Sequence, residues 1–278
     1  MIDAHHHLWK YNSRDYVWMT GEMQVLRRDF LIRDLQPLMR ETGVTGVVTV
    51  QARQTVEETQ WLLDVAKEHR EIHGVVGWVP LVAEDVGDML SKFATTPVLK
   101  GVRHVLHDEP DDDYMLRPDF NRGIRELRRF GLTYDILIFE RHLPQTIRLV
   151  QQHPNQVFIV DHIAKPRIRD GVLSPWRERL IELASYPNVF CKISGMVTEA
   201  RWHAWTDRDL APYFEIVLNA FGPRRLMFGS DWPVVTLASD YGRWVRTFRE
   251  AIAVLTADEQ AFITTRTAAE TYKLGVAE

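Results

Sequence analysis

Residues 44–70 read VTGVVTVQARQTVEETQWLLDVAKEHR, and the kind of fold can be inferred from how this stretch is built. Its first part, 44–51, is almost continuously apolar and rich in β-branched residues. Such a run is typical of a strand that is buried on both faces of a parallel sheet. The segment TVEE at 55–58 then matches a capping box, so we predict a helix that begins there and extends through Arg70.

The same strand–helix unit recurs along the chain. Apolar runs, each followed by a helix-like segment, lie at residues 2–5, 44–51, 74–79, 98–103, 132–138, 157–161, 189–194 and 226–231. Gly131 and Gly222 mark helix ends, and TADE at 256–259 opens a last helix. Alternating strands and helices predict parallel strands joined by helical crossovers. We therefore expect an α/β fold, a single TIM (β/α)8 barrel over residues 1–278, with a doubly wound open sheet as the alternative.

The composition is that of an ordinary globular protein. The chain has 278 residues, of which 45% are hydrophobic and 26% charged, and its formal net charge is -4. This charge balance argues against nucleic acid or an anionic membrane surface as the main partner. The lone cysteine, Cys191, allows no intrachain disulfide, and its apolar neighbours favour a buried core residue over a nucleophile. Because the sequence has no signal-peptide pattern and no apolar stretch of membrane-spanning length, we predict a cytoplasmic protein.

The segment 8–29 interrupts the rhythm directly after the first predicted strand. It contains the large side chains Trp9, Tyr11, Tyr16, Trp18 and Met19. On a barrel, a loop at this place lies over the catalytic face, so one interpretation is a lid whose aromatic rings contact a ring-shaped ligand. The other is a loop that packs on the barrel or on a second subunit, which would make the protein a homodimer. The two interpretations are compatible.

Polar side chains end nearly every apolar run. They are His5, His7, Gln51, Trp78, Arg103, His104, Asp135, Asp161, His162, Lys192, Ser194, Ser230 and Asp231. The carboxyl ends of barrel strands converge on one bowl, where TIM-barrel enzymes do their chemistry, so this pattern predicts an enzyme. Within the bowl we expect substrate contacts from Gln51, Trp78, His104, Lys192, Trp232 and Trp18.

The histidines suit a metal site. His5 and His7 are two positions apart on a strand, so both imidazoles point to the same side. Together with His162 and Asp231 they form a ligand set that fits one divalent ion, Zn²⁺ before others. The same four residues can also work without metal. In that case Asp231 is the base, and the histidines hydrogen-bond the water or the substrate.

Asp231 and Arg103 are the strongest catalytic candidates, with His162 beside them. Asp231 emerges from the apolar run 226–230, and a carboxylate beside a polarised water is what a hydrolase needs. Arg103 keeps its charge and could stabilise an oxyanion, or it could pair with the acidic run 108–113. Lys165 and Lys192 are weaker candidates. The remaining histidines outside the strand ends are expected to be solvated or structural: His69, His73, His107, His142, His153 and His203.

These residues lie in motifs that resemble a known family. The opening IDAHHHLW at 2–9 resembles the I-D-x-H-x-H-x-W start of the amidohydrolase superfamily, and specifically of its sugar-lactonase branch. Further segments resemble that branch in order: GVRH at 101–104, DEP at 108–110, VDHIAKP at 160–166, KISG at 192–195 and FGSDWP at 228–233. The set covers most of the chain.

The branch contains L-fuconolactonase, L-rhamnonolactonase and 2-pyrone-4,6-dicarboxylate lactonase types. The resemblance implies a distorted TIM barrel in which Asp231 activates water, His5, His7 and His162 line the site, and Arg103 contacts the substrate carbonyl. Members of this branch differ in whether they hold one divalent ion. A binuclear centre is not expected, because the fourth strand lacks the bridging lysine of two-metal members.

We therefore expect a lactonase that opens a sugar-derived lactone, of the L-fucono or L-rhamnono type, by attack of water on the ester carbonyl. One alternative is a dicarboxylate lactonase, for which Arg53, Arg103, Arg167 and Arg201 could supply the cations. Another is a metal-dependent decarboxylase of an aromatic carboxylic acid, because a sister branch of the superfamily carries out that reaction. A non-catalytic binding barrel is the least favoured hypothesis.

Overall fold

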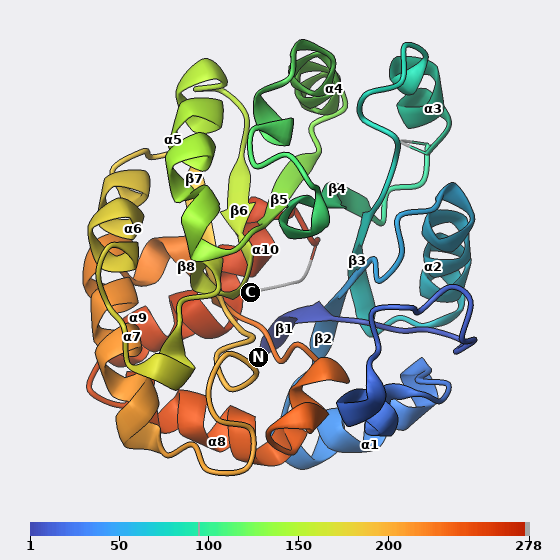
Figure 1. The fold of residues 1–278 in the computed structure, drawn as a ribbon. Coiled ribbons are helices and arrows are strands. Elements are labelled where there is room, and N and C mark those ends of the chain that lie inside the picture. The colour runs from blue at the N-terminus through green and yellow to red at the C-terminus, as the bar shows by residue number, and fades with distance from the viewer. Residues whose placement is uncertain (94, 276–278) are drawn as a thin grey trace.

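The computed structural model describes residues 1–93 and 95–275, and within them a parallel eight-stranded sheet is ringed by helices (Figure 1). The strands are β1 Ile2–His6, β2 Gly46–Val50, β3 Ile72–Gly77, β4 Leu99–Val105, β5 Thr133–Leu137, β6 Phe158–Val160, β7 Val189–Ile193 and β8 Leu226–Phe228. The helices are α1 Ile32–Thr42, α2 Val56–Glu68, α3 Val86–Phe93, α4 Pro118–Arg129, α5 Leu143–Gln152, α6 Trp176–Ala184, α7 Asp207–Phe221, α8 Tyr241–Ile252, α9 Ala257–Ala261 and α10 Thr267–Thr271. Every predicted apolar run overlaps a strand, so the predicted TIM barrel is confirmed.

The helix starts and ends that the sequence indicates are found close to their predicted positions. The Thr55 hydroxyl accepts a hydrogen bond from the Glu58 amide at 3.1 Å, so α2 begins one residue later, at Val56. Gly131 and Gly222 follow α4 and α7 with φ near 66° and 65°, a region that glycine enters without a steric penalty. Strand order runs from β1 to β8 without crossing, as helical crossovers between parallel neighbours require.

The barrel closes through residues that follow β8 rather than through β8 itself. The Asp231 amide donates to the His5 carbonyl and the His7 amide donates to the Trp232 carbonyl, both at 2.7 Å. A parallel bridge between His6 and Trp232 lies between these two bonds. The seam therefore joins the first strand to the loop that carries the predicted base, at the catalytic end of the barrel.

The barrel interior is layered. Its lower part is apolar: Ile2, Val48, Val76 and Met227 pack with Tyr272, which follows α10 and closes the base. Above them lies a charged layer, which we define as Arg103, Asp135, Asp161 and Lys192, all buried. The upper end opens into a cavity. The charged layer thus separates the apolar base from the bowl in which chemistry is expected.

The segment 8–29 both packs on the barrel and faces the cavity. Trp9 is fully buried, its indole donates to the Arg28 carbonyl at 2.9 Å, and it forms an antiparallel bridge with Phe30. Trp18 is 36% exposed and lies on the cavity wall. The segment therefore packs on the barrel and contributes to the cavity wall, and its role as a lid stays a prediction.

Within the described part of the chain, no helix combines the length and the apolar character that crossing a bilayer requires.

Candidate active site

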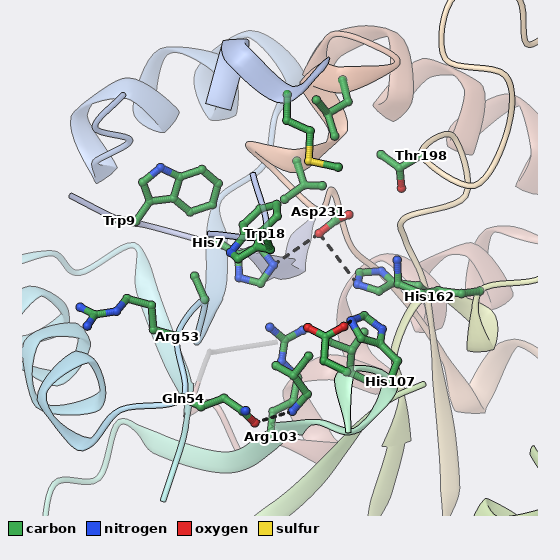
Figure 2. A pocket seen from close by; sticks show the side chains of 18 of the residues that line it. His7, Trp9, Trp18, Arg53, Gln54, Arg103, His107, His162, Thr198 and Asp231 are labelled. Carbon is green, nitrogen blue, oxygen red and sulfur yellow. Dashed lines mark hydrogen bonds and ion pairs between the residues drawn. The ribbon is translucent and has the colours of Figure 1, made fainter. Parts of the chain in front are cut away.

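A cavity of about 670 Å³ occupies the bowl at the carboxyl ends of the strands (Figure 2). His7, Arg103, His162 and Asp231 lie in its wall together with residues from the loops. The loop contributors include Trp9, Arg14, Asp15, Trp18, Arg53, Gln54, His107, Asp108, Lys165, Thr198, Glu199 and Trp202. The strand-end residues that we expected to lead catalysis therefore share one solvent-accessible space.

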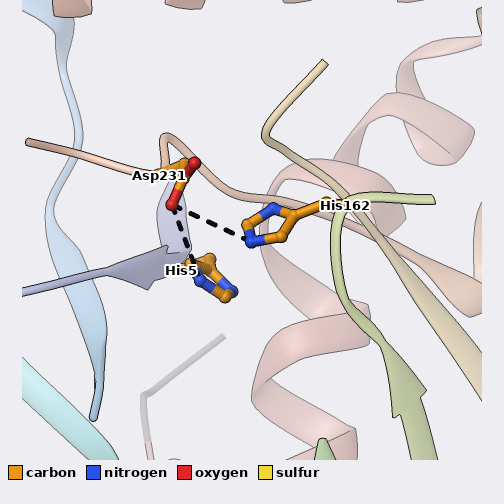
Figure 3. A group of neighbouring side chains, drawn as sticks. All are labelled: His5, His162 and Asp231. Carbon is orange, nitrogen blue, oxygen red and sulfur yellow. Dashed lines mark ion pairs between the residues drawn. The ribbon is translucent and has the colours of Figure 1, made fainter. Parts of the chain in front are cut away.

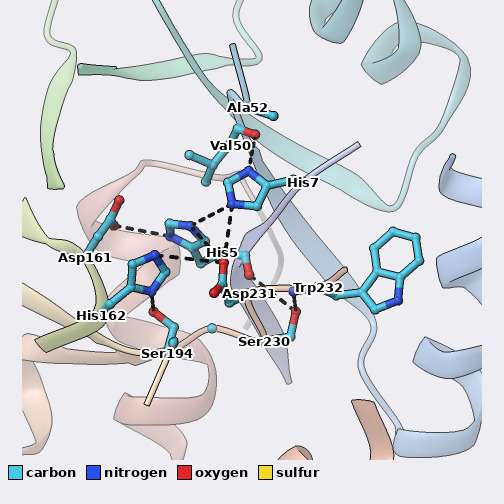
Figure 4. Close-up of polar contacts among 12 residues, drawn as sticks. His5, His7, Val50, Ala52, Asp161, His162, Ser194, Ser230, Asp231 and Trp232 are labelled. Atoms are coloured by element: carbon cyan, nitrogen blue, oxygen red, sulfur yellow. Dashed lines mark hydrogen bonds and ion pairs between the residues drawn. The ribbon is translucent and has the colours of Figure 1, made fainter. Parts of the chain in front are cut away.

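Three imidazoles converge on one carboxylate oxygen at the floor of this cavity (Figure 4). Asp231 Oδ1 lies 3.4 Å from His7 Nε2, 3.8 Å from His5 Nε2 and 3.9 Å from His162 Nε2. His5 Nε2 and His7 Nε2 are 3.3 Å apart, so the two histidines of the first strand face the same point. Asp231 itself has φ of 59°, a left-handed conformation that turns its side chain into the bowl.

A separate partner occupies the Nδ1 atom of each imidazole. His7 Nδ1 lies 2.9 Å from the Val50 carbonyl, which can only accept, so this nitrogen carries the proton. His5 Nδ1 lies 3.2 Å from Asp161 Oδ1, and His162 Nδ1 lies 2.9 Å from the Ser194 hydroxyl. With the Nδ1 side held, each ring presents Nε2 to Asp231.

Burial keeps the imidazoles of His5 and His162 neutral. It lowers the pKa of His5, and the Lys192 ammonium lowers it further, although Asp161 acts in the opposite direction. Burial also lowers the pKa of His162, and His5 and Lys165 add to this effect. A neutral imidazole whose Nδ1 is protonated has a free lone pair on Nε2, which is the form that binds a metal or accepts a hydrogen bond.

The donor set fits a small divalent ion. One atom each of His5, His162 and Asp231 lies within 4.8 Å of the others (Figure 3), and His7 borders this group. Ligands of a tetrahedral zinc ion lie about 3.4 Å from one another, which is close to the separations around Asp231 Oδ1. Lone pairs that face a carboxylate repel it unless a positive charge lies between them, so this arrangement is suited to a cation or a proton.

Arg103 is held rigidly at the edge of this centre. Its Nη2 donates to the Gln51 side-chain oxygen at 2.7 Å and to the Gln51 carbonyl, and its Nη1 pairs with Asp161 Oδ2 at 3.1 Å. Nη1 also lies 3.3 Å from His5 Nε2. Its salt bridge is therefore made with Asp161, and the alternative partner, the acidic run 108–113, does not take that place.

Most of the residues expected to contact substrate lie behind the cavity wall. Trp18 is in the wall. Gln51 is fully buried and holds Arg103. The Trp78 indole donates to His104 Nδ1, and His104 Nε2 lies 2.6 Å from Glu109. Trp232 is 2% exposed and packs edge-on against Phe30. Among the described residues, none of these four lies in the cavity wall, and their contact with substrate stays a prediction.

Lys192 also lies below the cavity, in the charged layer. Its ammonium is 2.6 Å from Asp135 Oδ2, 3.0 Å from Asp161 Oδ1 and 3.2 Å from His5 Nδ1. The side chain is fully buried, so it cannot reach a substrate carbonyl in this arrangement. Lys192 lies one residue before the end of β7. The sequence shows that it is near a strand end but does not show whether its side chain faces the cavity or the barrel interior.

Several residues of the cavity wall lie outside the strand ends that the sequence pattern indicates. His107 was expected to be solvated or structural, but it lines the cavity and stacks on Phe139 with ring centroids 4.6 Å apart. Burial lowers its pKa to about 3, and the cations Lys165 and Arg103 contribute. Glu199 does not lie at a strand end, so the pattern of strand ends gave no sign that it lines the cavity. The signal available for both was their place in loops that follow β4 and β7.

An unusual backbone turn carries His162 and Lys165. Residues 162–165 all have positive φ, between 48° and 62°, although none is glycine. The turn is fixed by burial of Ile163 and Ala164 and by a 2.8 Å hydrogen bond from the Trp176 indole to the Ile163 carbonyl. Gly195 faces it, where an added Cβ would lie 2.5 Å from His162 Nδ1. The turn therefore aims His162 at Asp231 and requires glycine opposite.

Comparisons with known proteins point to one family. Residues 2–274 match the amidohydrolase family. An L-fucono-1,5-lactonase from Burkholderia multivorans is 39% identical over 98% of this chain and 96% of its own length. A second L-fucono-1,5-lactonase, from Burkholderia ambifaria, is 40% identical over 88% of this chain and 85% of its own. A crystal structure of a Burkholderia multivorans amidohydrolase with bound zinc superimposes with a TM-score of 0.95 at 38% identity, covering 98% of both chains.

The family match spans the barrel from the first strand, which carries His5 and is followed by His7, to the segment after α10. It therefore includes every strand end that contributes to the cavity. On this evidence, the chain belongs to the amidohydrolase family.

Proposed function

We propose that the protein hydrolyses a sugar-derived lactone to its aldonic acid, with L-fucono-1,5-lactone as the first candidate substrate. The observation that carries this proposal is the convergence of His5, His7 and His162 on Asp231 at the floor of an open cavity. The names of two relatives at about 40% identity support the substrate class. The aromatic wall, which includes Trp9 and Trp18, suits the ring of such a substrate.

Asp231 serves as the general base in this proposal. It takes a proton from a water molecule while the water oxygen forms a bond to the lactone carbonyl carbon. When the tetrahedral intermediate collapses, the bond between the carbonyl carbon and the ring oxygen breaks, and Asp231 returns the proton to that oxygen. The new carboxylic acid then loses a proton to solvent. One lactone and one water therefore give one hydroxy acid, and the proton released can be measured.

Arg103 stabilises the negative charge that develops on the carbonyl oxygen. Its guanidinium is fixed by Gln51 and Asp161, so it needs no reorganisation when charge develops. His162 and His7 orient the attacking water through Nε2. A divalent ion, zinc being our candidate, would supply Lewis-acid charge at this centre when bound by His5, His162 and Asp231.

The cations around the cavity favour this substrate class over a dicarboxylate. Arg167 was one of four arginines considered for a second carboxylate, but it pairs with Glu140 at 2.7 Å. Neither Arg167 nor Arg201 is in the cavity wall. The remaining two, Arg53 and Arg103, have carboxylate partners at 3.1 Å.

The test is acid release, followed with a pH indicator, on L-fucono-1,5-lactone and on a panel of aldono-1,4- and 1,5-lactones. Asp231→Asn should lower kcat about a thousandfold, because it removes the base without changing the size of the side chain. Asp258→Asn is the matched control, since Asp258 is 59% exposed on the surface, and it should leave kcat unchanged.

Wild-type activity no greater than that of Asp231→Asn on every lactone would refute the proposal. The decarboxylase hypothesis would then be tested by CO₂ release from aromatic acids, together with metal analysis of the purified protein.

A further inference from the structure

Charges around the cavity are balanced. Its wall contains four cationic side chains, Arg14, Arg53, Arg103 and Lys165, and four carboxylates, Asp15, Asp108, Glu199 and Asp231. A pocket built for an anionic substrate leaves cations without counterions, whereas paired charges offer donors and acceptors to neutral hydroxyl groups. The wall therefore has the character of a surface that recognises polyhydroxy compounds.

The pair of Lys165 and Glu199 is the most enclosed of the wall pairs. Lys165 Nζ donates to Glu199 Oε1 at 2.6 Å, and their side chains are 16% and 21% exposed. The pair of Arg53 and Asp15 is looser, at 3.1 Å, with exposures of 29% and 34%. Because screening by solvent is weaker where exposure is lower, the Lys165–Glu199 pair has the larger influence on which charge the cavity accepts.

The location of this pair places it beside the reacting centre. Lys165 ends the left-handed turn that carries His162, and Glu199 belongs to the loop after β7, whose Thr198 and Trp202 also line the cavity. Burial lowers the pKa of Lys165, but the Glu199 carboxylate raises it by more, and Asp231 adds to this increase. The net result is a pKa above the ordinary value for lysine. Lys165 is therefore a full cation that depends on Glu199 for neutralisation.

We infer that the Lys165–Glu199 pair is a specificity determinant that selects uncharged polyhydroxy lactones and excludes lactones bearing a second carboxylate. The ammonium donates to one hydroxyl of the substrate, and the carboxylate accepts from a neighbouring hydroxyl. An added carboxylate on the substrate would meet Glu199 and be repelled. The inference rests on the proposed lactonase activity, and it names the two residues that determine which lactones the enzyme accepts.

The test is Glu199→Gln, which keeps the size of the side chain and a hydrogen bond acceptor for Lys165 but removes the negative charge. Hydrolysis is measured on L-fucono-1,5-lactone and on glucaro-1,4-lactone, a lactone with a second carboxylate. We expect kcat/KM on the neutral lactone to fall about tenfold and kcat/KM on the acidic lactone to rise about tenfold, because Lys165 gains a new anionic partner.

Two further variants separate specificity from support of the loops. Glu140→Gln makes the same chemical change in the Arg167–Glu140 pair outside the wall, and it should leave the ratio of the two activities unchanged. Glu199→Gln combined with Lys165→Gln removes both charges, and it should lose the gain on the acidic lactone.

An equal fall of kcat/KM on both lactones in Glu199→Gln would show that the pair only fastens two loops, and no change of kcat/KM on either lactone would show that it has no part in selection. Either result overturns the inference while leaving the lactonase proposal intact. Absence of activity on the neutral lactone in the wild-type enzyme would instead overturn the lactonase proposal itself.

Discussion

Single residues in this site act through the atoms that do not face the substrate. His7 is fixed by the Val50 carbonyl, His5 by Asp161 and His162 by Ser194. The three partners differ in charge and strength, yet each leaves Nε2 directed at Asp231. The chemistry at Asp231 is therefore set by contacts one layer further from the cavity.

Glu58 shows the same principle behind the part of the wall that Ala52 and Arg53 form. It is 4% exposed, and its Oε2 accepts hydrogen bonds from the Ala52 and Arg53 amides at 2.9 and 2.7 Å. Burial raises its pKa from the ordinary value of 4.5 to about 7, although these hydrogen bonds act in the opposite direction. The folded protein therefore retains a proton that the unfolded chain releases between these two pH values.

This difference predicts how stability depends on pH. Between pH 4.5 and 7 the folded state binds more protons than the unfolded state at Glu58, so the free energy of unfolding falls as pH rises, by roughly 3 kcal/mol in total. Glu58→Gln keeps the acceptor for both amides and should remove this part of the slope. Urea unfolding at several pH values measures it, and an unchanged slope in the variant would contradict the assignment.

At the scale of elements, backbone segments in the left-handed region mark where the fold is under local strain. The turn 162–165 is held by buried side chains, and its strain is used to aim His162 and Lys165. Lys273 also has positive φ, 52°, at the end of α10, but its side chain is exposed. The turn 162–165 positions residues of the site, whereas the described contacts of Lys273 give its conformation no such role.

Lys273→Gly should therefore stabilise the protein. A non-glycine residue in this conformation costs about 1–2 kcal/mol, and the greater flexibility of glycine in the unfolded chain offsets part of the gain. The hydrogen bond from Lys100 Nζ goes to the Lys273 carbonyl at 2.8 Å, so it survives the change. We expect a rise in Tm of roughly 2 °C by calorimetry.

Lys67→Gly, within α2, is the opposite control. There glycine should lower Tm, because the backbone is helical and the substitution only adds flexibility to the unfolded chain. A fall in Tm in both variants would show that the conformation of Lys273 is not strained.

The strands and loops also show how much of the structure could be predicted from the sequence. Buried parallel strands are encoded locally as continuous apolar runs, so all the strands could be predicted, and the residues at their ends could be assigned to one bowl. Whether an end residue faces the cavity depends on a shift of one or two positions, so the sequence alone could not show that Lys192 lies below the cavity and Gln51 behind its wall. His107 and Glu199 reach the cavity through the path of a loop, and that path is fixed by tertiary contacts.

At the scale of the whole molecule, the charged layer connects the two ends of the barrel. The Tyr272 hydroxyl, at the base, donates to Asp135 Oδ2 at 2.6 Å. Asp135 pairs with Lys192, which pairs with Asp161, and Asp161 holds both His5 and Arg103. Buried charges of this kind add little net stability, so we interpret the layer as a means of positioning the catalytic residues.

Tyr272→Phe tests this role from the far end of the barrel. Removing one hydroxyl should lower kcat about tenfold and leave KM unchanged, because the perturbation reaches His5 and Arg103 at the reacting centre but not the loop residues of the cavity wall. Tyr213→Phe is the control, since it loses a comparable hydrogen bond, to the Val172 carbonyl at 3.1 Å. If both variants lose thermal stability while kcat stays at the wild-type value, the layer has only a structural role.

The seam that closes the barrel also constrains how the protein is made. His5 and His7 are translated more than two hundred residues before Asp231, whose amide bonds to the His5 carbonyl. At usual rates of synthesis this delay is at least about ten seconds. Throughout it the first strand has a free edge and the nascent histidines lack Asp231 as a partner, so this strand is the part of the chain that a chaperone would need to shield.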